Sequence, residues 1–380
     1  MKNKRNTYQI FFVSAFSQII TFPIIINLSN RINLLSPLIN VIYIISFSLF
    51  IFPLAIFTFA FFPFSLIFEY IVIAFHRITY LLAKYCLIII TFPNFKRYII
   101  IYYIIILLII VFYNNKKIRF VFPSFLLIFL LLIYFTPYFN NKKEVYFLDL
   151  NNGDTIFIKD EYNKCNILID TGDGSNEIVT KFLMSKGIRT IDYLFITHNH
   201  VDHNGEIDTI LDNINVKKIV VSYYDNSFYT KQKNVIRVKK DDVIKCSNNI
   251  SFYILAPFIK SNDENDNSLI IYTKIGELSY LFLGDASKAK EEELIDLNLK
   301  VDVLKIAHHG SSTSTSPKFI ESIKPTYAII MSGRLKIFNF PSTKTINTLN
   351  LYAIKYFDTK QTYSVKIENY KDKTIIHTLR

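Results

Sequence analysis

Tryptophan is absent from the chain, and cysteine is rare, with three residues among 380. Cys86, Cys165 and Cys246 lie far apart, and one of them falls in an apolar run. Their spacing therefore indicates neither a disulfide framework nor a zinc ribbon. We expect buried or idle thiols.

Acidic residues are almost missing from the first part of the chain. Residues 1–143 contain one, Glu69, against thirteen lysines and arginines. Residues 144–380 hold thirty acidic and thirty basic residues, so the net charge of +12 belongs entirely to the first part. Positive charge among apolar runs is typical of loops beside membrane spans and anionic headgroups, and it argues against a basic nucleic-acid face on the second part.

Five apolar runs in the first part approach the length of about 20 residues that a membrane helix needs. The basic start of the chain lacks a small-residue cleavage site, so we expect an uncleaved first span. The third run carries Glu69, His76 and Arg77, and it suits either a span or an interfacial helix. The runs are 8–28, 38–62, 64–92, 98–113 and 120–136.

These runs predict a multi-pass protein of the cell membrane, but its orientation stays open. Five spans place six basic residues on the side of the N-terminus and five on the other side, which the positive-inside rule cannot separate. Within the first run, Gln18 and Thr21 suit either a transport pathway or a contact between helices, and we favour the contact.

After residue 143 the pattern changes to short alternating apolar runs separated by turn residues. Paired strands come first, and strands then alternate with helices, which predicts α/β sheets covered by helices. His198, Asp285 and His308 each follow the carboxyl end of an apolar strand, where ligand sites form in such sheets. We expect a helix from about 203 to 211.

Five of the seven histidines lie in two short runs, which predicts a metal site. In His-x-His-x-Asp-His, alternate residues point the same way, so His198 and His200 suit one metal ion. Asp202 and His203 then suit a second ion, with Asp285 bridging the two. The second run offers His308 or His309 to complete the second ion, and a water shared by the ions would be the nucleophile.

The run Thr197-His-Asn-His-Val-Asp-His203 resembles the signature of the metallo-β-lactamase superfamily, hydrolases with an αββα sandwich. More narrowly, the chain resembles the ComEC family of DNA-internalisation competence proteins. The resemblance covers nearly the whole chain. It is carried by Phe147-Leu-Asp-Leu-Asn-Asn-Gly-Asp154, Leu168-Ile-Asp-Thr-Gly172, Asn267-Ser-Leu269, Leu283-Gly-Asp285 and Asp302-Val-Leu-Lys-Ile-Ala-His-His-Gly-Ser-Ser-Thr-Ser-Thr-Ser316, and before 143 by Ser17-Gln18, Thr21, Pro23, Pro37 and Asn40.

The resemblance implies a role for each matching residue. Asp170 and Asp154 would orient the ligating histidines from behind, as such ligands usually require. Asp202 and His309 would have catalytic roles. The hydroxyls of Ser311, Ser312 and Thr313 would contact substrate phosphate, or else form an ordinary capping loop. The ligands of two divalent ions, zinc or manganese, would be His198, His200, Asp202, His203, Asp285, His308 and His309.

Three features depart from the pattern. No histidine lies between 203 and 308, where many superfamily members place a ligand. Asn339-Phe340-Pro341 stands where the family tends to have Gly-His-Pro. The N-terminal soluble domain and the earlier channel helices of the family have no counterpart, so other competence proteins would have to supply them.

We therefore predict a partial competence channel region in 1–143 and a metallo-β-lactamase-like domain in 144–380. The expected function is a membrane-anchored two-metal hydrolase, a DNA phosphodiesterase of DNA uptake whose partners are DNA and membrane lipids. A non-catalytic transport or scaffold component, and a hydrolase of another ester, remain alternatives.

Overall fold

The computed structural model describes residues 2–85, 87–227, 229, 232, 234–247, 250–335, 339–370 and 373–379. The chain divides into two compact units, residues 1–134 and residues 135–380. Cys86 lies outside the described residues, so nothing is said of its thiol.

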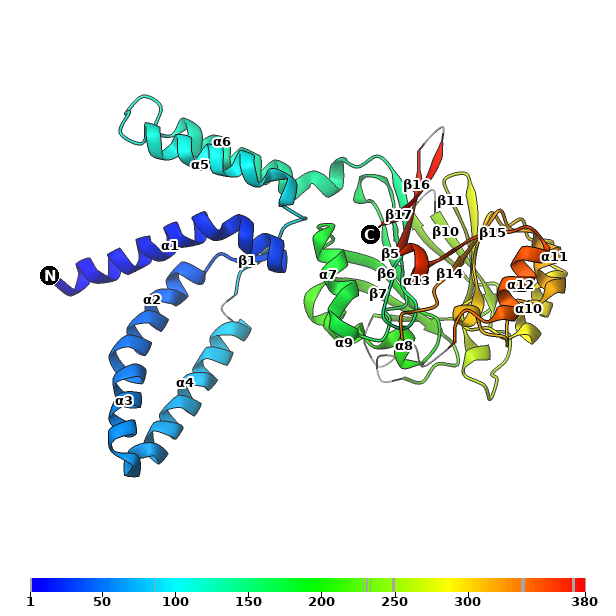
Figure 1. Ribbon diagram of the computed structural model, residues 1–380, viewed down its shortest axis with the longest axis horizontal. Coiled ribbons are helices and arrows are strands. Elements are labelled where there is room, and N and C mark those ends of the chain that lie inside the picture. Colours follow the sequence, from blue (N-terminus) through cyan, green and yellow to red (C-terminus); the bar gives the residue numbers. More distant parts are fainter. Residues whose placement is uncertain are drawn as a thin grey trace. The chain divides into compact units, whose positions relative to one another are not determined.

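The first unit consists of long apolar helices and one pair of short strands (Figure 1). A π-helical segment at Phe47–Ile51 joins α2 to α3 into one continuous helical rod. The elements are α1 (Lys2–Ser29), β1 (Arg31–Asn33), α2 (Ser36–Ser46), α3 (Phe52–Ala60), α4 (Ser65–Tyr85), β2 (Ile89–Thr91), α5 (Ile99–Phe112) and α6 (Val121–Phe135).

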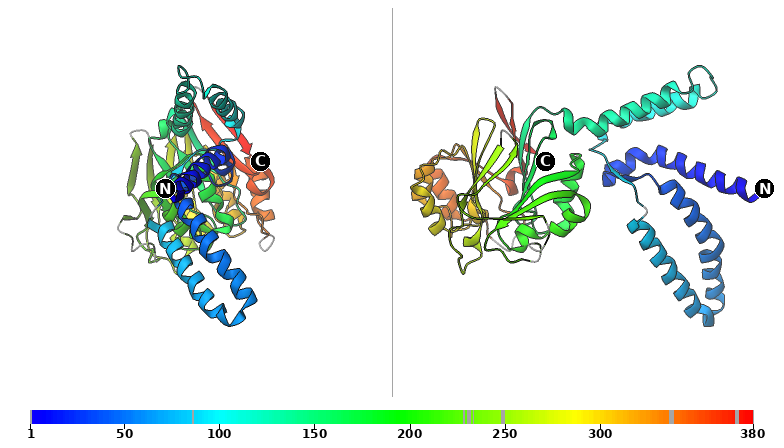
Figure 2. Two further views of the ribbon diagram at one scale, coloured as in Figure 1. Left: turned by 90° about the vertical axis from the view of Figure 1, so that its left-hand side faces the viewer. Right: turned by 180° about the vertical axis from the view of Figure 1, so that it is seen from behind.

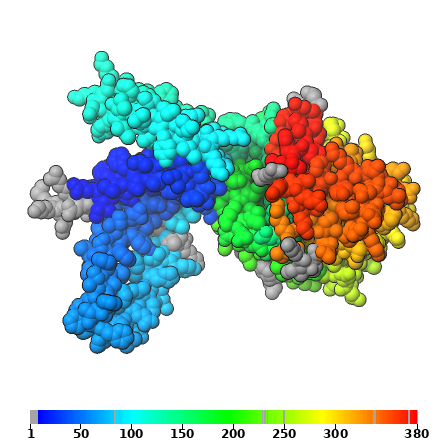
Figure 3. Space-filling view, viewed as in Figure 1, coloured from blue at the N-terminus to red at the C-terminus, as the bar shows by residue number. Residues whose placement is uncertain are grey.

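The helices of this unit extend as arms (Figure 3), and many of their exposed side chains are large and apolar. Phe59 is 94% exposed and Phe62 is 79% exposed. Soluble proteins rarely expose so many neighbouring apolar side chains to water. Four helical stretches among the described residues are long and apolar enough to cross a membrane. They are Tyr8–Ser29, Ser36–Ala60, Phe62–Leu82 and Val121–Phe139, so the third run of the sequence has the length and composition of a span.

A small aromatic core holds the helices of the first unit together near the β1–β2 pair. β1 and β2 pair antiparallel, which joins the end of α1 to the segment after α4. Phe22 of α1 packs against Phe95 and Tyr102, and the Tyr102 hydroxyl donates to the Ile19 carbonyl at 2.6 Å. Tyr134 at the end of α6 contacts Phe92 beside β2. The C-terminal ends of α1, α4 and α6 therefore meet at one end of this unit.

The second unit contains two mixed sheets (Figures 1 and 2). The eight-stranded sheet has the order β17-β16-β3-β4-β5-β6-β7-β8, and the seven-stranded sheet has the order β15-β14-β13-β12-β11-β10-β9. The strands of the first are β3 (Lys143–Phe147), β4 (Ile156–Lys159), β5 (Asn166–Ile169), β6 (Thr190–Ile196), β7 (Asn215–Ser222), β8 (Val235–Val238), β16 (Ser364–Asn369) and β17 (Thr374–Leu379). Those of the second are β9 (Val243–Ser247), β10 (Ile250–Ala256), β11 (Ile270–Ile275), β12 (Leu278–Phe282), β13 (Val303–Lys305), β14 (Tyr327–Ile330) and β15 (Lys355–Asp358).

Three apolar layers make this unit an αββα sandwich, as predicted. The middle layer lies between the sheets and contains Phe147, Phe195 and Phe252 from both of them. One outer layer packs the eight-stranded sheet against α7 (Ile178–Ser185) and α9 (Ile207–Asn213). The other packs the seven-stranded sheet against α10 (Lys288–Ile295), α11 (Pro317–Ile323) and α12 (Thr343–Leu351). Two single-turn helices, α8 (Val201–Asn204) and α13 (Thr359–Thr362), complete the unit.

The helix expected over 203–211 is two helices, α8 and α9, separated at Gly205 and Glu206. A side chain at Gly205 would meet the backbone of Asp173 at about 2.5 Å, so only glycine fits this close approach. The Glu206 carboxylate accepts hydrogen bonds from the Val179 and Thr180 amides at the start of α7. This contact with α7 separates α8 from α9, although the spacing of apolar residues alone would predict one continuous helix.

The expectation of idle thiols is wrong for two of the three cysteines. Cys165 and Cys246 form a disulfide with a Cα–Cα distance of 6.0 Å. Cys165 precedes β5 and Cys246 belongs to β9, so the bond joins the two sheets. The residues are 81 positions apart, and their spacing in the sequence carries no sign of the pairing.

Candidate metal centre

The carboxyl ends of neighbouring parallel strands bring the predicted ligands together. β5 and β6 are parallel neighbours, as are β12 and β13 in the other sheet. Asp170 follows β5, His198 follows β6, Asp285 follows β12, and His308 follows β13. Both sheets thus direct polar side chains to the same edge of the sandwich, as open α/β sheets do at ligand sites.

The Asp285 carboxylate lies at the centre of the cluster. Its Oδ1 lies 3.3 Å from Nε2 of His203, and its Oδ2 lies 3.5 Å from Nε2 of His309. His198 and His308 approach the same Oδ2 at 4.0 and 3.9 Å. Four imidazoles from two separate sequence runs therefore surround one buried carboxylate.

The remaining residues of the first run complete two groups around this centre. His200 Nδ1 lies 3.0 Å from His198 Nε2, on the extended segment that the alternation predicts. Asp202 Oδ2 lies 3.2 Å from His309 Nε2. The structure thus pairs His198 with His200, and Asp202 with His309, on either side of Asp285.

A carboxylate stands behind each of two histidines. Asp170 Oδ2 lies 2.8 Å from Nδ1 of His203, and Asp154 Oδ1 lies 3.2 Å from Nδ1 of His309. Burial opposes the charged imidazoles, but Asp285 and Asp170 raise the pKa of His203 well above its ordinary value. Likewise, Asp285 and Asp154 raise the pKa of His309 to about 10 against the cost of burial. These carboxylates therefore favour the charged forms of His203 and His309.

The other two histidines of the cluster have hydroxyl groups behind them. Thr197 Oγ1 lies 3.2 Å from Nδ1 of His198, and Thr313 Oγ1 lies 3.2 Å from Nδ1 of His308. Burial lowers the pKa of His198 well below its ordinary value, with a further contribution from the cation of His203. Burial also lowers the pKa of His308. Burial therefore favours the neutral forms of His198 and His308, which are the forms that bind metal.

His308 and His309 adopt the left-handed backbone conformation in succession, with φ of 49° and 54°. Such φ values are uncommon for residues other than glycine, and they persist where the surroundings impose them. The turn directs the His309 ring toward Asp154 and Asp202, and the His308 ring toward Thr313. Both histidines therefore reach the centre, although they are adjacent in the sequence.

The turn that carries Asp154 rests directly on the histidine run. Gly153 has a φ of +89°, and a side chain there would collide with the Asp202 carbonyl. The Asp154 amide donates to the same carbonyl at 3.2 Å. The Asn-Asn-Gly-Asp turn therefore needs its glycine to place Asp154 beside His309.

Lys305 is a member of the cluster that the sequence reasoning missed. Its side chain is fully buried in β13, forms an ion pair with Asp154, and donates to the Gly284 carbonyl at 3.0 Å. The ammonium also lies 3.9 Å from Asp285 Oδ1. The signal in the sequence is a single lysine inside an otherwise apolar strand, which costs too much to bury without a counter-charge.

The residues present fit a divalent metal ion. One ligand atom from each of Asp154, His203, Asp285 and His309 lies within 4.8 Å of the other three. Among the described residues, buried His203 Nε2, Asp285 Oδ1 and His309 Nε2 have no hydrogen-bond partner. Orphaned imidazole nitrogens and a carboxylate oxygen, converging in a buried site, are the donor set that zinc and manganese accept.

The predicted substrate residues lie at the rim of the centre and differ in exposure. Ser311 is buried, and its hydroxyl accepts a hydrogen bond from Thr313 Oγ1 at 2.9 Å. Ser312 and Thr313 are exposed. Phe340, at the position where the family has histidine, places its ring 5.9 Å from both the His308 and His309 rings.

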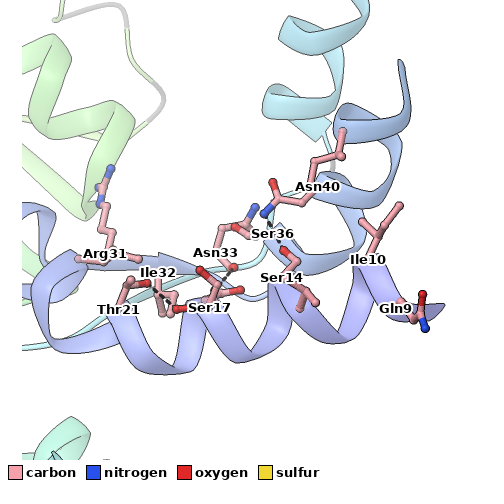
Figure 4. Close-up of a pocket in the computed structure, with 14 residues that line it drawn as sticks. Gln9, Ile10, Ser14, Ser17, Thr21, Arg31, Ile32, Asn33, Ser36 and Asn40 are labelled. Carbon is pink, nitrogen blue, oxygen red and sulfur yellow. Dashed lines mark hydrogen bonds between the residues drawn. The ribbon is translucent and has the colours of Figure 1, made fainter. Parts of the chain in front are cut away.

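The first unit contains a separate polar cavity of about 940 Å³ along α1 (Figure 4). Gln18 and Thr21 line it, together with Ser14 and Asn40. Gln18 donates to the Asn33 carbonyl, and Asn40 donates to Ser14 Oγ at 2.7 Å. Gln18 therefore links α1 to β1 and Asn40 links α2 to α1, whereas the Thr21 hydroxyl donates to the Ser17 carbonyl within α1.

Comparisons with known proteins match each part of the chain to a family. Residues 148–334 match the metallo-beta-lactamase superfamily. Residues 1–117 match the family described as competence protein. The resemblance to the ComEC family is confirmed. In this ComEC-like chain the competence match precedes the metallo-β-lactamase match.

Two curated relatives of this ComEC-like chain are longer than the chain itself. The chain is 28% identical over 270 residues to ComE operon protein 3 of Bacillus subtilis, covering 62% of this chain and 34% of that protein. It is 30% identical over 243 residues to Recombination protein 2 of Haemophilus influenzae, covering 61% and 30%. The chain therefore spans about a third of the length of these relatives. Among solved structures, the metallo-β-lactamase fold protein YhfI of Bacillus subtilis is 10% identical, with a TM-score of 0.43 over 58% of this chain and 98% of that one.

Proposed function

We propose that residues 144–380 are a metal-dependent phosphodiesterase that acts on DNA during DNA uptake, and that residues 1–143 anchor them in the cell membrane. The observation that carries this proposal is the buried Asp285 carboxylate surrounded by four imidazoles. Among the described residues, Asp285 Oδ1 and Nε2 of His203 and His309 are buried there without a hydrogen-bond partner. The competence-protein match of residues 1–117 supports the link to DNA uptake. The apolar helical stretches support the membrane anchor.

The geometry supports two neighbouring ion positions that share Asp285. One would be held by Asp202, His203 and His309, and the other by His198, His200 and His308. In this assignment His308 takes the place of the histidine that the chain lacks between 203 and 308. Two such ions would supply an ionised water and stabilise charge on the scissile phosphate.

The two carboxylates proposed to hold the ions, Asp202 and Asp285, differ in their exposure to solvent. The Asp202 side chain is 26% exposed, whereas that of Asp285 is 3% exposed. Burial raises the pKa of Asp202, but the neighbouring His309 and His203 imidazoles outweigh it and lower the pKa below the usual range. Asp202 therefore stays ionised, and it is the catalytic carboxylate able to orient a water molecule toward the substrate.

Cations at the rim suit a phosphodiester despite the neutral charge of this part of the chain. Lys288 Nζ donates to the Ser312 carbonyl at 2.9 Å, and Lys360 Nζ donates to the Phe340 carbonyl at 3.3 Å. The Lys288 ammonium therefore lies next to the backbone of Ser312, and the Lys360 ammonium lies next to the backbone of Phe340. Local placement of two lysines can serve phosphate oxygens where net charge gives no sign of it.

Metal-loaded protein tests the proposal directly. The full chain in detergent is loaded with Zn²⁺ or Mn²⁺ and offered single-stranded DNA, double-stranded DNA and a small phosphodiester. Asp285→Asn should abolish cleavage. Asp192→Asn should retain it, because the Asp192 carboxylate in β6 contacts the Asn166 amide and Lys217 and no residue of the cluster. Absence of cleavage with either ion would refute the proposal and favour a transport or scaffold role. Cleavage of the small ester alone would favour a hydrolase of another substrate.

A further inference from the structure

The carboxylates behind His203 and His309 differ in their reach toward the metal centre. Among the described residues, the group of four whose ligand atoms lie within 4.8 Å of one another includes Asp154 but not Asp170. The position of Asp154 therefore fits two roles: it can bind a metal ion directly, or it can orient the His309 imidazole. The two roles differ in the coordination of the ion, because a carboxylate ligand adds an oxygen donor to it.

Both oxygens of the Asp154 carboxylate already have partners. Oδ1 lies 3.2 Å from Nδ1 of His309, and Oδ2 forms an ion pair with the Lys305 ammonium. The side chains of Asp154 and Lys305 are each 2% exposed, so water does not compete for this ion pair. A metal ion would have to displace either the histidine or the lysine to reach an Asp154 oxygen, and breaking a buried ion pair costs much free energy.

Lys305 reaches Asp154 from the other sheet of the sandwich. It lies in β13 of the seven-stranded sheet, whereas Asp154 lies in the turn between β3 and β4 of the eight-stranded sheet. The ammonium also donates to the Gly284 carbonyl at 3.0 Å and lies 3.9 Å from Asp285 Oδ1. That Asp285 oxygen is closer to Nε2 of His203, at 3.3 Å. Lys305 therefore contacts Asp154 and leaves Asp285 facing the imidazoles.

The charge of Lys305 also changes how strongly each carboxylate attracts a divalent cation. The ammonium neutralises Asp154 at contact distance, so this carboxylate attracts a second cation less than Asp285 does. A metal ion on the same Asp154 oxygen would bring two cations together in a buried site, where their repulsion is weakly screened. Contact and charge therefore both direct the ions to Asp285 and away from Asp154.

We propose that Lys305 is a positioning residue that keeps Asp154 out of the metal coordination and in contact with His309. The inference rests on the metal centre of the proposed function, but not on cleavage of DNA. Removing a lysine that only supports the fold would weaken metal binding, typically about 10–100-fold for a lost orienting contact. The proposed role predicts a different result: Lys305→Met frees Asp154 Oδ2, and the bound ion gains an oxygen ligand.

Cobalt(II) reports this coordination, because its visible absorption weakens as ligands are added to the ion. The full chain in detergent is titrated with Co²⁺, and the absorption per bound ion is recorded together with the affinity, measured by competition with a chromophoric chelator. Lys305→Met should bind Co²⁺ no more weakly than the wild type and should absorb less. Lys290→Met is the matched control, because Lys290 is a buried lysine paired with Glu293 on α10, and it should change neither quantity.

The double variant Lys305→Met/Asp154→Asn decides the question even where the single variant does not fold, because it removes both buried charges together. It should show the wild-type absorption, since it lacks the freed carboxylate. A stronger absorption than that of the wild type would overturn the inference, because Asp154 would already have been a ligand. Wild-type absorption in a folded Lys305→Met variant would overturn it as well. A wild type that binds no Co²⁺ would instead refute the metal centre itself, and the inference with it.

Discussion

Replacing Asp170 by asparagine changes the proton position on a metal ligand while keeping the shape of the side chain. Asp170 Oδ1 accepts from the Thr197 amide at 2.7 Å, and Oδ2 faces both the Thr197 hydroxyl and His203 Nδ1 at 2.8 Å. Asparagine has one acceptor oxygen, which the Thr197 amide requires. Its NH₂ group then faces His203 Nδ1, so that nitrogen must become an acceptor. The proton moves to Nε2 and removes the lone pair aimed at the centre.

The expected loss follows from this single change of tautomer. Removing a group that orients a ligating histidine typically lowers metal affinity about 10–100-fold, equivalent to about 1.4–2.7 kcal/mol. We therefore expect Asp170→Asn to bind Zn²⁺ at least tenfold more weakly than the wild type. Asparagine also lacks the second acceptor oxygen that faces the Thr197 hydroxyl. A loss of about 1–3 kcal/mol in the free energy of unfolding should therefore accompany the weaker metal binding.

Metal competition with a chromophoric chelator measures the affinity, and thermal unfolding of the metal-free protein measures the stability. Asp192→Asn is the matched control, because Asp192 is a carboxylate that accepts from the Asn166 amide and from Lys217 without touching the cluster. The control should lose stability but keep its metal affinity. If Asp170→Asn binds zinc within twofold of the wild type, Asp170 does not set the tautomer of His203.

Three further outcomes test other parts of the structure. Burial raises the pKa of Glu291 from 4.5 to about 7, so the stability that its neutral form contributes is complete below about pH 4.5 and is lost as pH rises through 7. The shift corresponds to about 3 kcal/mol, and Glu291→Gln should flatten this decline in thermal scans from pH 5 to 8; parallel curves would contradict it. Because metal must displace protons whose pKa is raised at His203 and His309, zinc affinity should rise steeply between pH 6 and 9, and a flat profile would exclude these ligands. Reducing the bond between Cys165 and Cys246 should lower the free energy of unfolding by about 4.5 kcal/mol for an 81-residue separation, measured by the urea midpoint with and without reductant; an unchanged midpoint would contradict a structural bond.

The sequence predicted the parts of the site that depend on strand ends. His198, Asp285 and His308 follow apolar strands, and parallel strands must bring their carboxyl ends to one edge. Alternation in the histidine run predicts that His198 and His200 point the same way, and their ring nitrogens lie 3.0 Å apart. These features are local, so the pattern of apolar and polar residues is enough to locate them.

The missed features depend on contacts between distant segments. From the sequence alone, Lys305 in β13 would be expected to face solvent. Its burial depends on an ion pair with Asp154, which lies between two strands of the other sheet. Cys165 and Cys246 become partners only when the two sheets stack, and periodicity does not specify which strands face one another. Tertiary pairing, not local pattern, determines these contacts.

The environments behind the four histidines divide the centre into two unequal halves. His203 and His309 are backed by Asp170 and Asp154, and both have raised pKa values. His198 and His308 are backed by threonine hydroxyls and have lowered pKa values. A carboxylate behind an imidazole increases its basicity and fixes its orientation, whereas a hydroxyl does so only weakly. The half that contains His203 and His309 should therefore hold its ion more tightly, and the half that contains His198 and His308 should exchange its ion more readily.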